Sequence, residues 1–338
     1  MDPFLLSRLN SSIKRSVAGT NLDLKGLLVV TECATGAYSC TPAIASLAGA
    51  AKVVAFGKNS SYGTFEGARK DVYCLWEALG LSQNGLLATD SLDVLDDNLE
   101  RADIVTNSGH LRPLNSERIK RMKKGCVIPL MYESWEFRHT DLCLQTCQER
   151  GIPVAGTNER HPDIGVFDYL GPMAAKSLFN AGLEIHGNNI LLICDNDFAL
   201  YLGKTLKTLG ANVLRNAQTV SNNIDAVVFA HTPPESGGTL TIDSMDLPER
   251  VPVCCQLWGN VDRSCFKTKW VPEKEPEAGH MGLMLPSIGI QPVVKLQVGG
   301  LKVGEIMARA RQSGLKAQDC IKLAVEKGFG ARTANFYS

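Results

Sequence analysis

Short apolar runs without polar alternation recur along the chain, and such runs predict strands that are buried on both faces, as in parallel sheets. In the first half of the chain they occur at residues 27–31, 52–56, 102–107, 126–130 and 152–155. Segments that favour helices lie between them, at residues 43–50, 115–124 and 140–150. Strands that alternate with helices in this way predict a doubly wound parallel sheet.

The same succession of elements returns in the second half of the chain. Strands are predicted at residues 189–194, 212–214, 225–230 and 251–255, and a helix is predicted at residues 199–209. The expected fold class is therefore α/β, with two tandem doubly wound Rossmann-like domains joined by long interdomain helices. We place the first domain at residues 1–165 and the second at 166–303, with helices at 304–313 and 317–327 of the segment 304–338 packing back on the first.

Composition and charge agree with two ordinary globular domains. A chain of 338 residues is long for one hydrophobic core, and its 44% hydrophobic and 21% charged residues match average folded proteins, which excludes a disordered class. Lys plus Arg equals Asp plus Glu at 35 each, so no net field attracts nucleic acid or an anionic membrane. The basic cluster at residues 118–124 is interpreted as a solvated helix face.

The remaining global features indicate a cytoplasmic location and no metal. The first 21 residues contain no apolar run of signal-peptide length, and no stretch approaches the ~18 apolar residues of a membrane span. The eleven cysteines are odd in number and include no C-x-x-C pair. We interpret them as small buried apolar residues, because cytosolic cysteines rarely form disulfides.

The loop at residues 31–42 joins a buried strand to a helix, where ligands bind in doubly wound sheets. Gly36, Ser39 or Thr41 can serve the start of the helix, so two interpretations stay open, helix-start chemistry and a ligand site. Helix capping does not require Glu32 or Tyr38, so these two residues favour a ligand site. We therefore name Glu32 as a candidate catalytic residue and Thr35, Tyr38 and Ser39 as candidate substrate contacts.

Other polar loops follow neighbouring strands and border the same crevice. Residues 58–63 form one such loop, and residues 107–112 form another that offers Asn107 and His110 as substrate contacts. Residues 133–139 point to the same end of the sheet. The charged segment 158–163 is either a solvated linker, which we favour, or one wall of the cleft.

The layout of residues 22–310 resembles the D-2-hydroxyacid dehydrogenase and S-adenosylhomocysteine hydrolase superfamily. There a flavodoxin-like outer domain flanks a dinucleotide-binding domain. Residues 151–154, after a polar helix, resemble the end of the outer domain, and residues 166–168 resemble the start of the linker helix. The resemblance implies NAD or NADP as cofactor, a small-molecule or peptide substrate in the interdomain cleft, and a homodimer.

The segment 186–203 lies where that superfamily carries its G-x-G-x-x-G fingerprint, with Cys194, Asn196 and Ala199 in place of the glycines. A side chain at Asn196 obstructs the backbone approach of a pyrophosphate, and Asp195 and Asp197 add negative charge. The acidic residue that would hold the ribose, at the end of the next strand, is missing. Cys194, Asp195, Asn196 and Ala199 are thus the cofactor-binding candidates of a site where we expect weak NAD binding.

The catalytic pattern of the superfamily is changed as well. Trp258 takes the position of an arginine that would clamp a carboxylate, and it becomes a candidate substrate contact. Glu273 and His280 echo the later Glu and His of the superfamily. The resemblance implies that Glu273 orients His280, which acts as general acid and base.

Three functional hypotheses follow. The first is a small-molecule enzyme related to NAD-dependent 2-hydroxyacid dehydrogenases that acts in the interdomain cleft. The second is a catalytically relaxed ligand-binding or partner-binding protein of a biosynthetic pathway. In the third, the first domain holds a nucleotide at residues 35–41. Changes in the fingerprint favour the second and third over a conventional dehydrogenase.

Overall fold

The computed structural model describes residues 1–215, 223–233, 239–240, 251–265 and 268–331. The chain forms two compact units, the first made of Met1–Gly165 with Ile290–Ser338, and the second of Val166–Gly289. The second unit therefore ends at Gly289 and not at residue 303. The reason is that the helix expected at 304–313 begins much earlier, at Gln291, and packs along its length on the first unit.

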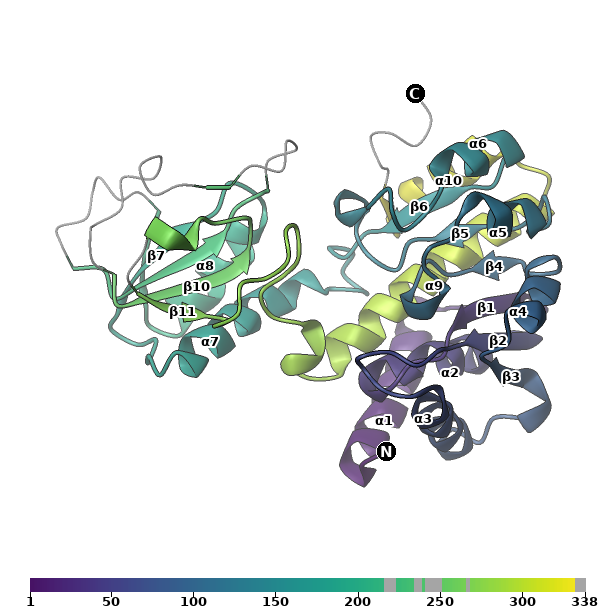
Figure 1. Ribbon diagram of the computed structural model, residues 1–338, viewed down its shortest axis with the longest axis horizontal. Coiled ribbons are helices and arrows are strands. Elements are labelled where there is room, and N and C mark those ends of the chain that lie inside the picture. Colours follow the sequence, from purple (N-terminus) through teal and green to yellow (C-terminus); the bar gives the residue numbers. More distant parts are fainter. Residues whose placement is uncertain (216–222, 234–238, 241–250, 266–267, 332–338) are drawn as a thin grey trace. The chain divides into compact units, whose positions relative to one another are not determined.

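The strands of the first unit lie side by side in the order β3-β2-β1-β4 and β12-β6-β5 (Figure 1). Parallel bridges from Ile104 to Val127 and from Asn107 to Leu130 place β4 beside β5. All pairs are parallel except β12 with β6. The strands are β1 (Leu28–Glu32), β2 (Lys52–Phe56), β3 (Leu86–Thr89), β4 (Ile104–Val105), β5 (Ile128–Pro129), β6 (Val154–Thr157) and β12 (Gly330–Ala331).

The helices of this unit are α1 (Pro3–Thr20), α2 (Cys40–Leu47), α3 (Phe65–Ala78), α4 (Leu92–Leu99), α5 (Ser116–Arg121), α6 (Leu144–Arg150), α9 (Gln291–Gln312) and α10 (Ala317–Glu326). Helix α1 was not expected. It begins because Asp2 accepts a hydrogen bond from the Leu5 amide and Pro3 occupies the first turn, and it buries Leu9 and Ile13. The α/β fold class with its parallel strands is confirmed.

Helix α9 contacts β4, β5 and β6 through glycines, which explains how a helix with three glycines is stable there. A Cβ atom added to Gly299 would lie 2.9 Å from Thr157 Cγ2 and 3.1 Å from Ile164 Cδ1. One added to Gly304 would lie 3.1 Å from Ile104 Cγ2. Glycine lowers helix propensity by about 1 kcal/mol relative to alanine, and the close packing offsets this loss.

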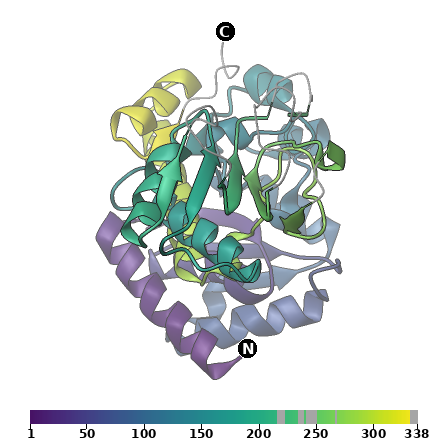
Figure 2. The same cartoon turned by 90° about the vertical axis from the view of Figure 1, so that its left-hand side faces the viewer.

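The second unit has one parallel sheet with the order β11-β10-β9-β7-β8, and Figure 2 shows its strands side by side. Its strands are β7 (Asn189–Ile193), β8 (Asn212–Leu214), β9 (Ala226–Ala230), β10 (Val253–Trp258) and β11 (Lys269–Val271). Helices α7 (Leu170–Asn180) and α8 (Phe198–Thr208) pack against each other. The segment expected as one helix at 166–181 is a short 3-10 turn (Phe167–Tyr169) followed by α7.

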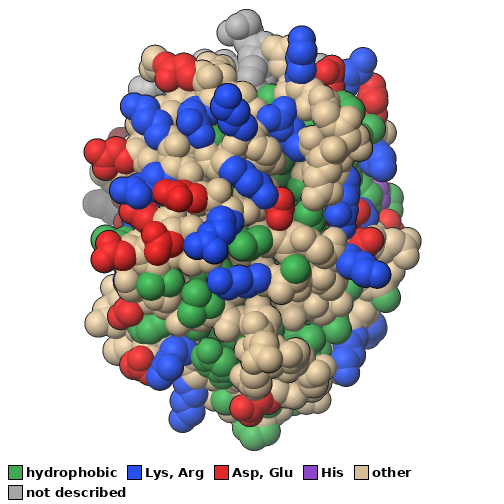
Figure 3. All heavy atoms as spheres, turned by 90° about the vertical axis from the view of Figure 1, so that its right-hand side faces the viewer, with side chains coloured by type: hydrophobic (Ala, Val, Ile, Leu, Met, Phe, Trp, Pro, Cys, Tyr) green, Lys and Arg blue, Asp and Glu red, His purple; other side chains and the backbone are tan. Residues whose placement is uncertain are grey.

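Three of the five basic residues at 118–124 contact other residues of the first unit through their side chains. Arg118 donates to the Leu111 carbonyl, Arg121 lies 3.4 Å from Asp96, and Lys123 forms an ion pair with Asp103. Figure 3 shows Lys and Arg side chains interspersed with Asp and Glu on one face of the molecule. These contacts agree with a solvated helix face.

The close packing around the glycines of α9 predicts how substitutions there change stability. Gly299→Ala should lower the free energy of unfolding by about 1–3 kcal/mol, because Thr157 and Ile164 must move. Gly19→Ala, in α1 with nothing within 4 Å of the added methyl group, should be neutral or stabilise by up to about 1 kcal/mol. Urea unfolding of both variants measures the difference, and a stabilising Gly299→Ala would contradict the close packing.

Candidate functional site

Buried polar side chains of the first unit gather at the carboxyl ends of its strands. Within the described ranges, the buried Asp, Glu, Lys or Arg side chains are three glutamates, Glu32, Glu133 and Glu159. They lie at the end of β1 and just beyond the ends of β5 and β6. Ionisable groups are rarely buried without a partner, so this edge of the sheet is the candidate site.

The register between β1 and β4 brings Glu32 and Asn107 to the same place. Val30 pairs with Val105, and the Thr106 amide donates to the Val30 carbonyl at 3.0 Å. The Thr106 hydroxyl donates to the Thr31 hydroxyl at 2.9 Å, which shows that these two side chains share one face. Since side chains alternate, Glu32 and Asn107 follow on the other face.

The chain reverses its winding direction between β1 and β4. From β1 the strands β2 and β3 follow on one side, whereas β4, β5 and β6 follow on the other. The ends of β1 and β4 are therefore the topological switch point, where ligands bind in open α/β sheets.

Glu32 is 5% exposed and has an unusual environment. Its carboxyl group lies against Gly109, where an added Cβ atom would overlap its Oε2 atom. Burial raises the pKa of Glu32 from 4.5 to about 7, and the charge of Arg112 opposes the rise. Among the described residues, none donates a hydrogen bond to this carboxyl group. At neutral pH the group can therefore exist with or without its proton.

The Arg112 side chain contacts residues other than Glu32. Its Nε and Nη2 atoms donate to the Asn107 carbonyl at 3.2 and 3.0 Å, and Nη1 lies 3.7 Å from Asp141 Oδ2. Its guanidinium lies over the Tyr132 ring, 4.9 Å from the centroid. Tyr132 accepts a hydrogen bond from Asn107 Nδ2 at 2.8 Å and donates to Asp141 at 3.4 Å. Asn107 Oδ1 is buried and has no hydrogen-bond partner in the described part of the chain.

The loop after β1 uses most of its hydroxyl groups internally. Ser39 donates to the Gly36 carbonyl at 2.8 Å, and Thr35 donates to the Tyr62 carbonyl at 3.3 Å. Thr41 donates to Gln297 at 3.0 Å. Neither Ser39 nor Thr41 caps the helix, because a 3-10 turn (Gly36–Ser39) precedes α2 directly. The expected cap is therefore wrong, and the backbone of the turn takes its place.

Tyr38 and His110 complete the part of the site that the sequence named. Tyr38 is half-buried, and burial together with the nearby Glu32 charge raises its pKa. His110 is half-buried in the turn after β4, where burial and then the charge of Lys58 lower its pKa. Both side chains thus favour their neutral forms.

The ends of β5 and β6 add three further carboxyl groups. Glu133 Oε1 accepts from the Glu159 amide at 3.0 Å, and Glu136 Oε1 accepts from the Glu133 amide at 3.3 Å. Burial raises the pKa of Glu136 to about 7, and burial and then the charges of Glu136 and Glu133 raise the pKa of Glu159 well above its usual value. The segment 158–163 is therefore not a fully solvated linker, because Glu159 is 7% exposed.

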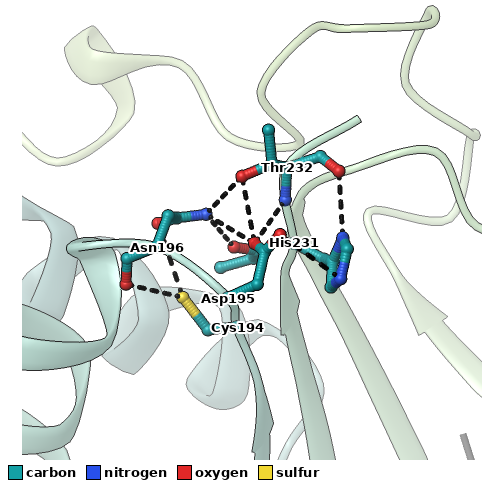
Figure 4. Close-up of polar contacts among 6 residues, drawn as sticks. Cys194, Asp195, Asn196, His231 and Thr232 are labelled. Atoms are coloured by element: carbon teal, nitrogen blue, oxygen red, sulfur yellow. Dashed lines mark hydrogen bonds and ion pairs between the residues drawn. The ribbon is translucent and has the colours of Figure 1, made fainter. Parts of the chain in front are cut away.

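In the second unit the fingerprint loop is tied to the loop that follows β9 (Figure 4). Asp195 Oδ1 accepts from the Thr232 amide at 2.8 Å and from its hydroxyl at 3.0 Å. Asn196 Nδ2 donates to the Ala230 carbonyl at 2.9 Å, and Asn196 Oδ1 accepts from the Phe198 amide at 3.0 Å. These side chains occupy the switch point between β7 and β9, and Asn196 takes an amide at the start of α8 that a phosphate would use.

The charge of this loop opposes an anionic ligand. Burial alone would raise the pKa of Asp195, but the hydrogen bonds from Thr232 and the nearby His231 lower it overall. His231 Nε2 lies 3.4 Å from Asp195 Oδ2. Cys194 donates to Asn196, and the Ala199 carbonyl accepts from Arg215 at 2.9 Å. All four cofactor-binding candidates of the fingerprint loop thus take part in hydrogen bonds within the protein.

The candidates Trp258, Glu273 and His280 of the second unit have different surroundings. Trp258 is 7% exposed and lies in the apolar core, with its ring 5.3 Å from that of Phe198. Glu273 is exposed, and its backbone carbonyl accepts from Arg263. His280 Nδ1 lies 3.9 Å from Glu277. Its acidic neighbour is therefore Glu277 and not Glu273, because a turn brings residue 277 back to residue 280.

The described part of the chain can be searched directly for metal-ion sites and for membrane-spanning helices. It contains no group of three or more His, Cys, Asp or Glu side chains arranged to hold a metal ion. None of its helices is both long and apolar enough to cross a bilayer. Ten cysteines are described with their side chains, and all are free thiols.

No family model matches the chain, and no curated protein matches it. Among solved structures, a dipicolinate synthase subunit from Bacillus halodurans is similar with a TM-score of 0.52 and 13% identity, over 86% of this chain and 99% of that one. The corresponding dipicolinate synthase chain from Bacillus subtilis has a TM-score of 0.45 and 12% identity, over 87% and 100%. D-2-hydroxyisocaproate dehydrogenase has a TM-score of 0.41 and 9% identity, over 71% and 73%.

The chain thus shares its two-unit α/β fold with the dipicolinate synthase subunit from Bacillus halodurans. At these identities the likeness concerns the fold. Within it, the sequence identified the loops at Glu32, Asn107 and residues 133–139, but it missed Tyr132 and the burial of Glu159. Tyr132 could have been found from the register, since it lies two residues beyond Leu130, the bridge partner of Asn107.

Glu32 predicts a distinctive dependence of stability on pH. The folded protein keeps this group protonated up to about pH 7, whereas the unfolded chain ionises it near its ordinary pKa of 4.5. The folded state thus binds more protons in this window, and the free energy of unfolding falls as the pH rises through it. Glu32→Gln stays neutral and should gain roughly 3 kcal/mol relative to the wild type between about pH 4 and about pH 8. Urea unfolding at both pH values measures the gain.

A matched control for this variant is Glu66→Gln, because Glu66 is an exposed residue of α3 paired with Arg69. It should leave the difference between the two pH values within about 0.5 kcal/mol of the wild type. If Glu32→Gln behaved like this control, Glu32 would ionise normally in the folded protein.

The closed fingerprint loop predicts weak binding of NAD. The double variant Asp195→Gly/Asn196→Gly should bind NAD at least about tenfold more tightly than the wild type, because a carboxylate repels a phosphate by about 1 kcal/mol at 4 Å in water and more in a crevice. Isothermal titration calorimetry gives both affinities. Thr232→Val is the control, since it removes one hydrogen bond to Asp195 and keeps the charge. Tight binding of NAD at this loop of the wild type would overturn the interpretation.

Proposed function

We propose that this protein is a small-molecule enzyme that binds its substrate at the ends of β1 and β4, with Glu32 as the group that transfers a proton. The single observation that carries the proposal is the state of Glu32, which is 5% exposed, has no hydrogen-bond donor among the described residues and has a pKa of about 7. A general acid or base works best when its pKa lies near the working pH. Perturbed carboxyl groups concentrate at functional sites.

The fold supports a small-molecule substrate. The solved structure with a TM-score of 0.52 is named as part of a synthase, and the superfamily fold is shared by small-molecule dehydrogenases. A relation to NAD-dependent 2-hydroxyacid dehydrogenases therefore remains our first functional class. The substrate is a small molecule or a peptide, and the homodimer implied by the resemblance stays a prediction.

Each neighbour of Glu32 has a separate role in this proposal. Gly109 allows the carboxyl group to approach the backbone closely, which no residue with a Cβ atom permits. Arg112 lies near Glu32 and holds the Asn107 carbonyl, so it is a positioning residue. Tyr38, in the loop after β1, offers a neutral hydroxyl to the substrate.

Hydride transfer through NAD or NADP at residues 194–199 has less support. The hydrogen bonds of Asp195 and Asn196 fill the place where a pyrophosphate would lie. This specific observation favours a second candidate function, a protein that binds a ligand at Glu32 without a nicotinamide cofactor and without turnover. The two candidates share the site and differ in whether the ligand is changed.

Incubation of the purified protein with an extract of soluble metabolites tests the proposal. At about pH 7 the wild type should deplete one compound and accumulate another, as followed by mass spectrometry. Glu32→Gln should slow this change by about 100-fold or more, because general acid–base catalysis contributes that much, whereas Glu66→Gln should not. Enrichment of a compound without conversion would favour the second candidate. Equal turnover by Glu32→Gln would refute the role of Glu32.

A further inference from the structure

The polar groups at the switch point are acceptors that lack donors. Glu32 receives no hydrogen bond from the described residues, and Asn107 Oδ1 is buried without a partner there. The orientation of the Asn107 amide follows from Tyr132, which donates towards Asp141 and so accepts from Asn107 Nδ2. A buried acceptor without a donor is costly, and a ligand that brings donors removes that cost.

The buried charged side chains at this edge of the sheet all have the same sign. The three buried charged side chains of the described ranges are Glu32, Glu133 and Glu159, and no Lys or Arg is buried there. Arg112 is partly exposed and is bound to the Asn107 carbonyl and near Asp141. Arg160, the cation nearest to Glu133 and Glu159, is exposed. The site therefore lacks a buried cation.

We infer that the ligand of this site carries a protonated amino group that binds Glu32, an inference that rests on the proposed function because that function places the ligand there. An ammonium group donates three hydrogen bonds and supplies the missing positive charge. Glu32 and Asn107 lie at the same end of neighbouring strands, at the switch point where ligands bind in open α/β sheets. The aromatic ring of Tyr38, in the adjacent turn, suits the apolar part of such a ligand.

An anionic ligand fits the same residues poorly. The hydroxyl groups of Thr35 and Ser39 already donate to backbone carbonyls, and Nε and Nη2 of Arg112 donate to the Asn107 carbonyl. A phosphate or carboxylate at Glu32 would meet a like charge, and the Arg112 guanidinium beside it already donates to the Asn107 carbonyl. The alternative in which residues 35–41 hold a nucleotide phosphate is therefore an opposing outcome of the test.

Three four-carbon probes distinguish the ligand classes: putrescine with two ammonium groups, butanediol with two hydroxyl groups and succinate with two carboxylates. Nuclear magnetic resonance of full-length protein labelled with nitrogen-15 only in glycine reports on the site. Gly109 lies against the Glu32 carboxyl group, and Gly36 lies in the loop that follows Glu32. Putrescine should shift these two amide signals saturably. Glu32→Gln should weaken its binding at least tenfold, whereas Glu66→Gln should not change it.

The outcomes separate this inference from the proposed function. If succinate or butanediol shifts the same signals as strongly as putrescine does, the amino-group inference is wrong while a ligand site at Glu32 stands. If putrescine binds equally to Glu32→Gln, or shifts neither signal, the inference is also overturned. Turnover of a metabolite that lacks an amino group, lost in Glu32→Gln, would support the proposed function and refute the inference.

Gly109→Ala provides an independent check, because it keeps the Glu32 carboxyl group but displaces it. The added methyl group would overlap Oε2, and the backbone at Gly109 has a φ of +39° that disfavours other residues. Putrescine should bind this variant at least fivefold more weakly than the wild type, with the Gly36 signal as readout. Circular dichroism verifies that the variant is folded. Undiminished binding would show that the position of Glu32 is irrelevant.

Discussion

The parallel register between β1 and β4 determines where the polar groups of the candidate site lie. Because Val30 pairs with Val105, the Thr31 and Thr106 hydroxyl groups meet on one face, and Glu32 and Asn107 follow on the other. Val30 and Val105 share the face of Glu32 and Asn107 and belong to one apolar cluster, so a shift of one residue would exchange the faces and move Val30 out of that cluster. The hydroxyl contact and the apolar core thus specify the same register. The packing of the sheet therefore determines where the side chains of the site lie.

Helix α9 supports that register from a distant part of the sequence. Its glycines allow it to lie close to Ile104 and Thr157, at the strands that precede Asn107 and Glu159. Its Gln297 accepts the Thr41 hydroxyl at the start of α2, so the same helix also fixes the loop that carries Tyr38. A segment beyond the second unit in sequence therefore completes the first unit. The positions of the acidic residues depend on this return of the chain.

The sequence was sufficient for features that depend on local pattern. Uninterrupted apolar runs such as residues 226–230 can only be buried strands here, and the loop after each strand was correctly placed at the edge of the sheet. Features that depend on tertiary contacts were missed. Nothing in the residues around Glu159 distinguishes a solvated loop from a buried one, and the turn that pairs His280 with Glu277 is not visible before folding. The extent of α9 was underestimated because glycine weakens helices unless a neighbour fits against it.

Each unit has an acidic residue at its switch point, and the two residues differ in the hydrogen bonds that they receive. In the second unit the acidic residue after the first strand, Asp195, receives hydrogen bonds from Thr232 and lies near His231, so its charge is satisfied within the chain. In the first unit the acidic residue in the corresponding place, Glu32, receives none from the described residues. A satisfied group stabilises the fold, whereas a buried group without a donor destabilises it by about 1–3 kcal/mol. A fold carries such a cost where a ligand provides the missing donor, and this difference supports our proposal that the ligand binds in the first unit.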